Sequence, residues 1–183
     1  EIMISGIINT MITKNITPHV VFTANVSRIG WKRLALYVER VHMSLEDLFD
    51  NPENEKEVLG RYLKSDDVFI MCFQIIHTMV VLQRELKMKH HDLHPGNVFI
   101  QGIDDNMYYK GKRLNDYKYF KYRMNDQEYL IPNKGFLIKI ADFGLASIDC
   151  DKKRMYRVDM PLFKSKNMSD SDSSYESDES DES

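Results

Sequence analysis

The sequence predicts a mixed α+β fold in which helices and strands occupy different stretches of the chain. Apolar residues recur at helical spacing over residues 1–14 and again from Val68 to about Leu86. Short apolar runs bounded by turn residues predict strands. These runs lie at residues 20–26, 34–41, 98–101 and 136–141. The long helix is apolar over a wide face, so we expect it to be largely buried, with His77 as a core residue.

Capping signals define where the predicted helices begin. Ser44, with Asp47 three residues later, predicts a helix start directly after the strand at residues 34–41. The run Ser65-Asp66-Asp67 predicts the start of the long helix. Residues 51–57 are polar and predict a loop. A hairpin is expected from residues 117–124 and 127–131, with its turn at Asn125-Asp126.

Composition indicates one compact body followed by an acidic tail. The chain has 183 residues, 43% of them hydrophobic, and a formal net charge of −3. Residues 169–183 contain seven Ser and seven Asp or Glu but no Lys or Arg, so the body is mildly basic. Such a tail predicts disorder, and the modest charge of the body indicates neither a dedicated nucleic-acid binder nor a disordered chain.

The cysteines and apolar runs bear on the compartment. Cys72 and Cys150 lie too far apart in sequence for a metal-ligand motif, and two cysteines cannot build a disulfide framework. We expect a reducing, cytoplasmic environment. The longest apolar run, Val68–Leu82, is interrupted by polar residues and is short for a bilayer, and the N-terminus lacks a signal-peptide pattern, so no membrane partner is expected.

Two motifs carry the chemistry. The first is His90-His91-Asp92-Leu93-His94-Pro95-Gly96-Asn97, and the second is Lys139-Ile140-Ala141-Asp142-Phe143-Gly144-Leu145-Ala146. The first follows the long helix and precedes a short strand, and the second follows another strand. Carboxylate and amide oxygens are the ligands that Mg²⁺ prefers, and phosphoryl transfer needs such metal ions and an oriented hydroxyl.

In order and context these motifs resemble the catalytic loop and the metal-binding Asp-Phe-Gly of eukaryotic-type protein kinases. The resemblance implies that Asp92 accepts the proton of the substrate hydroxyl, and that Asn97 and Asp142 bind Mg²⁺ beside the phosphates of ATP. It also implies that His90 is structural. Its side chain would pack against Phe143 and so hold the Asp142-Phe143-Gly144 motif in place. The fold expected from it is a partial protein-kinase-like one with an inserted β-hairpin.

The same resemblance places a nucleotide site. Residues 34–41 running into the next helix resemble the kinase hinge, with Val38 at the gatekeeper position and the backbone of Glu39 and Val41 facing adenine. Phe99 would lie beneath the adenine ring. Glu1 matches the position of the helix-C glutamate that pairs with the ATP-contacting lysine. A core strand without a ligand is the alternative for residues 34–41.

Some residues depart from the kinase pattern. His94 stands where serine/threonine kinases usually carry Lys, and a histidine is mostly neutral at pH 7. The string Asp92-Leu93-His94-Pro95-Gly96-Asn97 is also similar to that of aminoglycoside and choline phosphotransferases. The insertion at residues 102–135, rich in Tyr and Lys, resembles that of protein kinases encoded by large DNA viruses, which would place the chain in a host cytoplasm or virion. A solvated hairpin is preferred there to a nucleic-acid surface.

The resemblance covers residues 1–147. It implies a remnant of the kinase small lobe at residues 1–41, the upper part of the large lobe at residues 42–165, and a disordered acidic Ser-rich tail at residues 166–183. No G-x-G-x-x-G glycine loop occurs in the sequence. We therefore expect a fragment or short form that binds nucleotide weakly and catalyses poorly on its own.

The predicted function is ATP-dependent phosphoryl transfer to Ser/Thr hydroxyls of a protein substrate, with ATP and Mg²⁺ as cofactors. Two alternatives remain open: transfer to a small hydroxyl compound, and a catalytically weak kinase-like binding module. No nucleic-acid partner is expected. The protein substrate and the oligomeric state are not predicted by the sequence.

Overall fold

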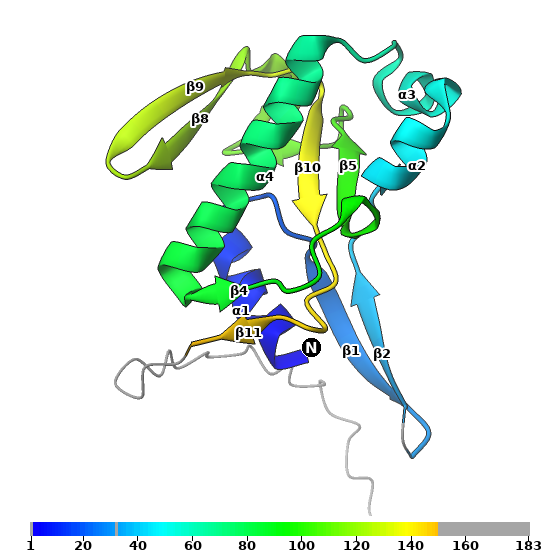
Figure 1. Ribbon diagram of the computed structural model, residues 1–183, viewed down its shortest axis with the longest axis vertical. Helices are drawn as coiled ribbons and strands as arrows, with labels where there is room; N and C mark the ends of the chain where they lie inside the picture. Colours follow the sequence, from blue (N-terminus) through cyan, green and yellow to red (C-terminus); the bar gives the residue numbers. More distant parts are fainter. Residues whose placement is uncertain (1, 32, 150–183) are drawn as a thin grey trace, which may run out of the picture.

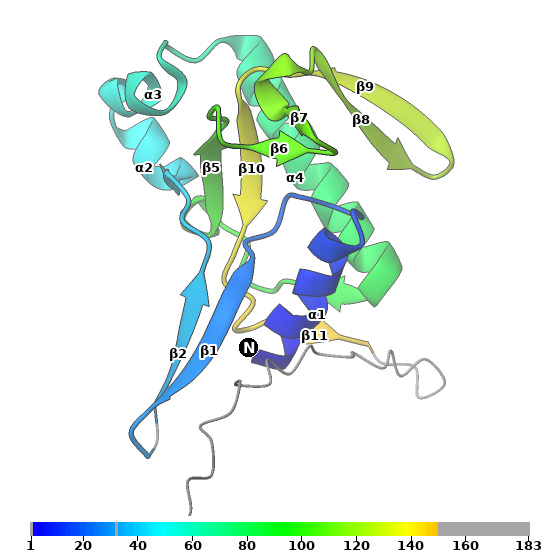
Figure 2. The same ribbon diagram turned by 180° about the vertical axis from the view of Figure 1, so that it is seen from behind.

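The computed structural model describes residues 2–31 and 33–149, and its helix and strand content confirms the predicted α+β class. A long helix crosses a small sheet. Two two-stranded hairpins project from the molecule, one at the top and one at the bottom of Figures 1 and 2. The elements are α1 (Ile2–Thr13), β1 (Thr23–Ile29), β2 (Arg33–Val38), β3 (Met43–Ser44), α2 (Leu45–Asp50), α3 (Pro52–Leu59), α4 (Ser65–Leu86), β4 (Met88–Lys89), β5 (Val98–Gly102), β6 (Tyr108–Tyr109), β7 (Lys112–Arg113), β8 (Tyr119–Met124), β9 (Gln127–Pro132), β10 (Phe136–Ile140) and β11 (Ser147–Ile148), with 3-10 turns at Pro95–Asn97 and Leu114–Asp116.

The central sheet has the strand order β10-β5-β3. Strands β10 and β5 are antiparallel, with Ile138 opposite Ile100 and Ile140 opposite Val98. Every residue of β10 is buried, as are four of the five residues of β5. Strands buried in this way read as continuous apolar runs, which is why the sequence predicted them correctly.

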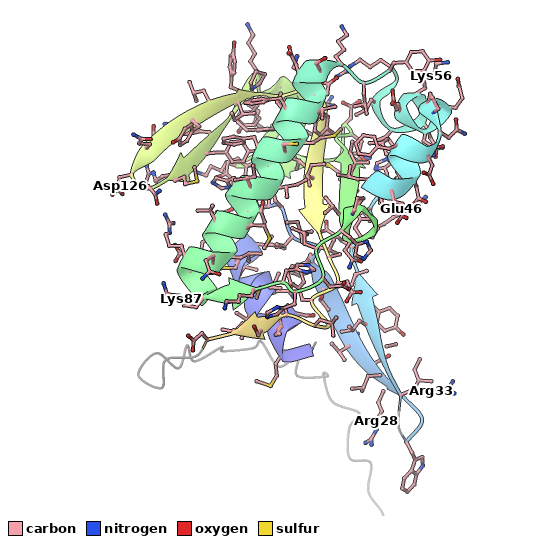
Figure 3. The ribbon with its side chains drawn as sticks, viewed as in Figure 1. Arg28, Arg33, Glu46, Lys56, Lys87 and Asp126 are labelled. Carbon is pink, nitrogen blue, oxygen red and sulfur yellow. The ribbon has the colours of Figure 1, made fainter. Side chains whose placement is uncertain are left out.

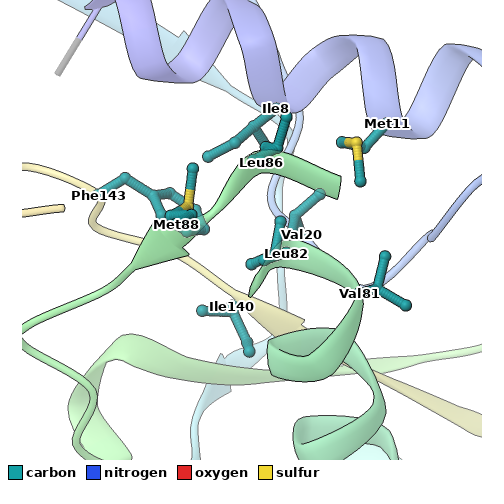
Figure 4. Close-up of a cluster of buried hydrophobic side chains, with 9 residues drawn as sticks. All are labelled: Ile8, Met11, Val20, Val81, Leu82, Leu86, Met88, Ile140 and Phe143. Carbon is teal, nitrogen blue, oxygen red and sulfur yellow. The ribbon is translucent and has the colours of Figure 1, made fainter. Parts of the chain in front are cut away.

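Helix α4 and strand β10 connect two apolar cores. The first core, drawn in Figure 4, joins α1, the end of α4, β4 and β10. It consists of Ile8, Met11, Val20, Val81, Leu82, Leu86, Met88, Ile140 and Phe143. The second core is built around α2 and the start of α4, from Leu45, Leu48, Ile70, Met71, Val98, Ile100, Phe136 and Ile138. Burial of each large apolar side chain contributes roughly 1.5–3 kcal/mol, so α4 is held along most of its length.

Helix α4 begins at Ser65, close to the predicted cap. The Asp67 carboxylate accepts the backbone N–H of Lys64 at 2.8 Å, which satisfies an exposed donor of the first turn. By length and composition alone α4 could cross a membrane, but 44% of the relevant window is buried inside the protein. His77 is buried as predicted, and its Nε2 lies 3.2 Å from the Arg123 carbonyl oxygen.

Two predictions of local structure were wrong. Residues 51–57 belong mostly to helix α3, because the Asn51 side chain accepts the Glu53 N–H at 3.0 Å and a proline occupies the first helical position. The strand expected at residues 20–26 is displaced to β1. Val20 and Val21 instead join β10, where Val21 N–H donates to the Ile140 carbonyl at 2.9 Å.

The inserted hairpin forms as predicted. Strands β8 and β9 pair in register, and Asn125 and Asp126 both have positive φ, as a tight two-residue turn requires. The hairpin packs on α4 through Tyr122, whose ring lies edge-on to His77 with centroids 4.9 Å apart. The aromatic residues of the insertion therefore pack against the body of the protein as well as against each other.

A buried histidine fastens this hairpin to the sheet. The Nδ1–H of His19 donates to the Ile138 carbonyl at 2.8 Å, and its Nε2 accepts the Tyr122 hydroxyl at 2.9 Å. The second contact requires the neutral ring, because a protonated Nε2 cannot accept a hydrogen bond. Burial, more than any other influence, lowers the pKa of His19 to about 3, while burial raises the pKa of Tyr122.

We expect His19 to make stability depend on pH. The unfolded chain binds a proton at this residue near pH 6.5, whereas the folded protein does so only near pH 3. The free energy of unfolding should therefore fall as the pH drops below 6.5, by about 1.4 kcal/mol per pH unit from this residue. Denaturant titrations at several pH values between 7 and 4 give the free energy of unfolding at each pH. This free energy should change less steeply with pH in His19→Gln than in the wild type. His42→Gln, at an exposed histidine, is the control, and equal slopes for the two variants would contradict the assignment.

Candidate functional site

The antiparallel pairing of β5 and β10 brings the two sequence motifs together. One motif ends where β5 begins, and the other begins where β10 ends, so Val98 lies opposite Ile140. The Ala141 N–H donates to the Asn97 carbonyl at 3.0 Å. Asn97 and Ala141, 44 positions apart in sequence, thus lie side by side at the same end of the two strands.

Asn97 connects the two sides of this site. Its Nδ2 donates to the Asp92 carbonyl oxygen at 3.0 Å and lies 3.4 Å from the Asp92 Oδ2. Both residues are half-buried, whereas Asp142 is exposed. With the bond from Ala141, Asn97 fixes the position of Asp92 relative to the strand that leads into Asp142.

The backbone of the site is strained at two places. Asp142 has φ 56° and His91 has φ 66°, both in the left-handed region that non-glycine residues rarely adopt. The Asp142 Oδ1 accepts the Gly144 N–H at 3.1 Å, which holds the turn that follows β10. Strain of this kind costs of order 1–3 kcal/mol and gathers at functional sites.

His90 supports the turn after Asp142. Its Nε2–H donates to the Ala141 carbonyl at 3.0 Å, and its ring lies 4.9 Å from the ring of Phe143. Both side chains are buried, and Phe143 belongs to the first core. The position of Asp142 is therefore set by core packing immediately beside it.

His94 and Gly96 shape the short turn before Asn97. The His94 Nδ1 accepts the Gly96 N–H at 3.2 Å, so this nitrogen carries no proton in the structure. A Cβ atom on Gly96 would lie 2.7 Å from the Glu46 Oε2 and 2.9 Å from the His94 Cε1, so a side chain there would require both of these exposed side chains to shift. His94 is the residue that the sequence places at the usual lysine position. One of its two ring nitrogens is already engaged in this local hydrogen bond.

Strands β4 and β11, which the sequence did not predict, frame the loop. Ser147 pairs with Lys89, and the Ser147 hydroxyl lies 2.7 Å from the His91 Nε2. Two-residue strands carry too few residues for a periodic signal, so only tertiary pairing defines them. The pairing returns the segment after Gly144 to the beginning of the loop that carries Asp92.

Of the residues predicted around adenine, Val38, Glu39 and Val41 lie at and just after the end of β2, whereas Phe99 lies on β5, and the role of the Glu39 N–H needs a correction. The Glu39 N–H donates to the Phe22 carbonyl at 2.8 Å, and the Glu39 Oε1 accepts the Phe22 N–H at 2.7 Å. The Glu39 N–H is therefore not available to bind adenine. The Glu39 carbonyl and the Val41 N–H have no backbone partner within residues 2–31 and 33–149. Val38 is exposed and Phe99 is half-buried.

Sequence reasoning missed Lys139, which pairs with Glu39. Their Nζ and Oε1 atoms lie 2.8 Å apart, and only 9% of the lysine side chain is exposed. The strand register places Lys139 directly opposite Phe99, so the two side chains share a face of the sheet. A lysine within the otherwise apolar run Phe136–Ile140 was the available signal. Glu1 lies outside the described residues.

A hollow of about 700 Å³ opens on the other side of the loop. His90, His91 and Leu93 line it together with Met88 and the C-terminal end of α4. None of Val38, Glu39, Val41 and Phe99 lines this hollow. It is therefore separate from the stretch on which the nucleotide is expected.

Two proteins of known sequence are similar to part of this chain. A serine/threonine-protein kinase of Acanthamoeba polyphaga mimivirus is 27% identical over 81 residues, and one of Dictyostelium discoideum is 32% identical over 82 residues. Part of this chain is related in sequence to serine/threonine-protein kinases. The matches cover 44% and 43% of the chain but only 16% and 6% of those relatives.

These two relatives confirm the predicted resemblance to protein kinases for part of the chain. Among solved structures, the kinase domain of Rad53 matches with a TM-score of 0.40 and 16% identity, covering 76% of this chain and 40% of that one. No protein-family model matches the chain. The sequence relatives show that part of this chain is similar to serine/threonine-protein kinases, and the helices and strands described above confirm the predicted α+β class.

Proposed function

We propose that this chain supplies the phosphoryl-transfer residues of an ATP-dependent serine/threonine protein kinase. The observation that carries the proposal is the position of Asn97, bonded to Asp92 on one side and to Ala141 on the other. Asp92, a candidate proton acceptor, and Asn97 and Asp142, two candidate metal ligands, thus belong to segments that meet where β5 begins and β10 ends. The kinase relatives support the reaction class, and the Ser/Thr acceptor is inferred from them.

The residues present fit a magnesium ion. The Nδ2 of Asn97 is used by Asp92, which leaves its Oδ1 as a ligand, and Asp142 is an exposed carboxylate. Within the described part of the chain no group of three or more His, Cys, Asp or Glu residues gathers around a metal position. Mg²⁺ needs no such cage, because it takes one or two protein oxygens and completes its shell with phosphate and water.

Each residue then has a defined role. Asn97 and Asp142 would hold Mg²⁺, which when bound neutralises charge on the phosphates of ATP. Asp92 accepts the hydrogen of the attacking hydroxyl and takes its proton as transfer proceeds. In the described part of the chain the Glu39 carbonyl and the Val41 N–H have no backbone partner, so they can bind the edge of adenine, and Phe99 lies on strand β5. Lys139 holds Glu39 in place.

Nucleotide binding tests the proposal directly. We expect the chain to bind ATP in a Mg²⁺-dependent way, and Asp142→Asn to weaken the binding at least tenfold, about 1.4 kcal/mol, because a metal ligand loses its charge. Isothermal titration calorimetry with and without Mg²⁺ measures this. Asp126→Asn removes the same charge from the exposed hairpin turn labelled in Figure 3 and should leave affinity unchanged.

The outcome also separates the alternatives. Metal-independent ATP binding that Asp142→Asn does not change would contradict the proposed site. Transfer to choline-like or sugar hydroxyls, with none to Ser/Thr peptides, would favour a small-molecule phosphotransferase. Metal-dependent binding without transfer to either acceptor would favour a kinase-like binding module.

A further inference from the structure

The free end of the β1–β2 hairpin exposes apolar side chains. Figures 1 and 2 show β1 and β2 projecting from the body, and Figure 3 shows Arg28 and Arg33 near their far end. Trp31 is 92% exposed, Ile29 57% and Leu34 58%. We call these five residues the hairpin tip. A tryptophan exposed to this degree contributes nothing to the core, and contiguous exposed apolar patches mark interaction sites.

The hairpin tip is also purely cationic. Residues 2–38 contain no Asp or Glu, although the chain has 28 acidic residues in all. Within residues 2–31 and 33–149 neither Arg28 nor Arg33 forms an ion pair, and Arg28 Nη2 donates to the Trp31 carbonyl at 3.0 Å. The two charges are therefore free to meet an anionic partner.

The strand register distributes these residues evenly around the tip. Arg28 lies opposite Leu34, and Ile29 lies opposite Arg33. Cross-strand partners point to the same face, and neighbours along a strand point to opposite faces. Each face of the hairpin tip therefore carries one arginine and one aliphatic side chain, with Trp31 at the turn between them. This geometry suits end-on contact with a surface.

We propose that the hairpin tip docks onto an anionic phospholipid surface. Tryptophan prefers the headgroup level of a bilayer, aliphatic side chains enter the acyl boundary, and arginines pair with lipid phosphates. A nucleic acid would use the cations and Trp31 but offers nothing to Ile29 and Leu34. Such peripheral contact needs no membrane-spanning segment, so it is compatible with the sequence. It does not depend on the proposed phosphoryl transfer.

The chain contains a single tryptophan, so its fluorescence reports on the hairpin tip alone. The full chain is mixed with vesicles of phosphatidylcholine, or of phosphatidylcholine with phosphatidylserine. We expect a blue shift of the emission and co-sedimentation with the anionic vesicles only, both weakened by high salt. No shift with anionic vesicles, or equal binding to neutral ones, would overturn the proposal.

Variants assign the contact to individual side chains. Arg28→Ala with Arg33→Ala should lower the vesicle partition constant about 25-fold, at about fivefold per arginine. Trp31→Ala, followed by sedimentation, should lower it about tenfold. Lys110→Ala with Lys112→Ala removes the same charge from another exposed hairpin, β6–β7, and should change it less than twofold. Equal loss in that control, or a Trp31 shift with an oligonucleotide but not with vesicles, would refute lipid docking.

Discussion

Replacing Asp92 with asparagine should lower the rate of phosphoryl transfer by about 10²–10⁴-fold, the usual contribution of a positioned general base. Asparagine has the same shape but cannot accept the proton of the attacking hydroxyl. The principal bond from Asn97 goes to the backbone carbonyl of Asp92, and only a 3.4 Å contact reaches the carboxylate. The loop should therefore keep its geometry, and the loss should be chemical.

Single-turnover transfer at saturating Mg·ATP, with a mixture of Ser/Thr peptides and small hydroxyl compounds as acceptors, measures this effect. ATP affinity should stay unchanged in Asp92→Asn, unlike in Asp142→Asn, because Asp92 is not assigned as a metal ligand. Asp126→Asn again serves as the control for loss of charge. A rate within tenfold of the wild type would remove Asp92 from the proposed chemistry.

The ion pair between Arg61 and Asp67 should have the largest effect on stability. Asp67 is fully buried, and its two oxygens accept Arg61 Nη1 and Nη2 at 2.6 and 2.9 Å. Asp67→Asn leaves the guanidinium without its charge partner, and we expect the free energy of unfolding to fall by about 3 kcal/mol. Urea titration monitored by circular dichroism measures it. Asp66→Asn, exposed in the same helical turn, should change it by less than about 0.5 kcal/mol.

The pH dependence gives a second test of this pair. Burial by itself would raise the pKa of Asp67, but the hydrogen bonds from Arg61 and from the Lys64 N–H outweigh it, so the pKa lies below its ordinary value. The stabilisation is present above the pKa of the unfolded state, about 3.9, and is lost as the pH falls through the lower folded value. The difference between wild type and Asp67→Asn should therefore shrink below about pH 4. A difference that stays constant down to pH 2 would contradict this origin.

The sequence was most informative where a local pattern carries the structural signal. The apolar spacing of α4, the buried strands β5 and β10, and the Asn125-Asp126 turn were each legible because helices, strands and tight turns impose their own periodicity. Helix α3 was missed although the Asn51-Pro52 cap was present, because its polar residues show no apolar face. Short motif spacing likewise indicated Asp92, Asn97 and Asp142.

Tertiary structure decided the contacts between residues distant in sequence. The bond from Ala141 to Asn97, the pair of Lys139 with Glu39, and the bond of His19 to Tyr122 join positions 44, 100 and 103 residues apart. No local spacing encodes such partners. The sequence by itself indicated Asp92, Asn97 and Asp142 as candidates for the chemistry, since the spacing within each motif is local. Only the folded chain decided how they are held, because strand pairing and core packing bring remote segments together.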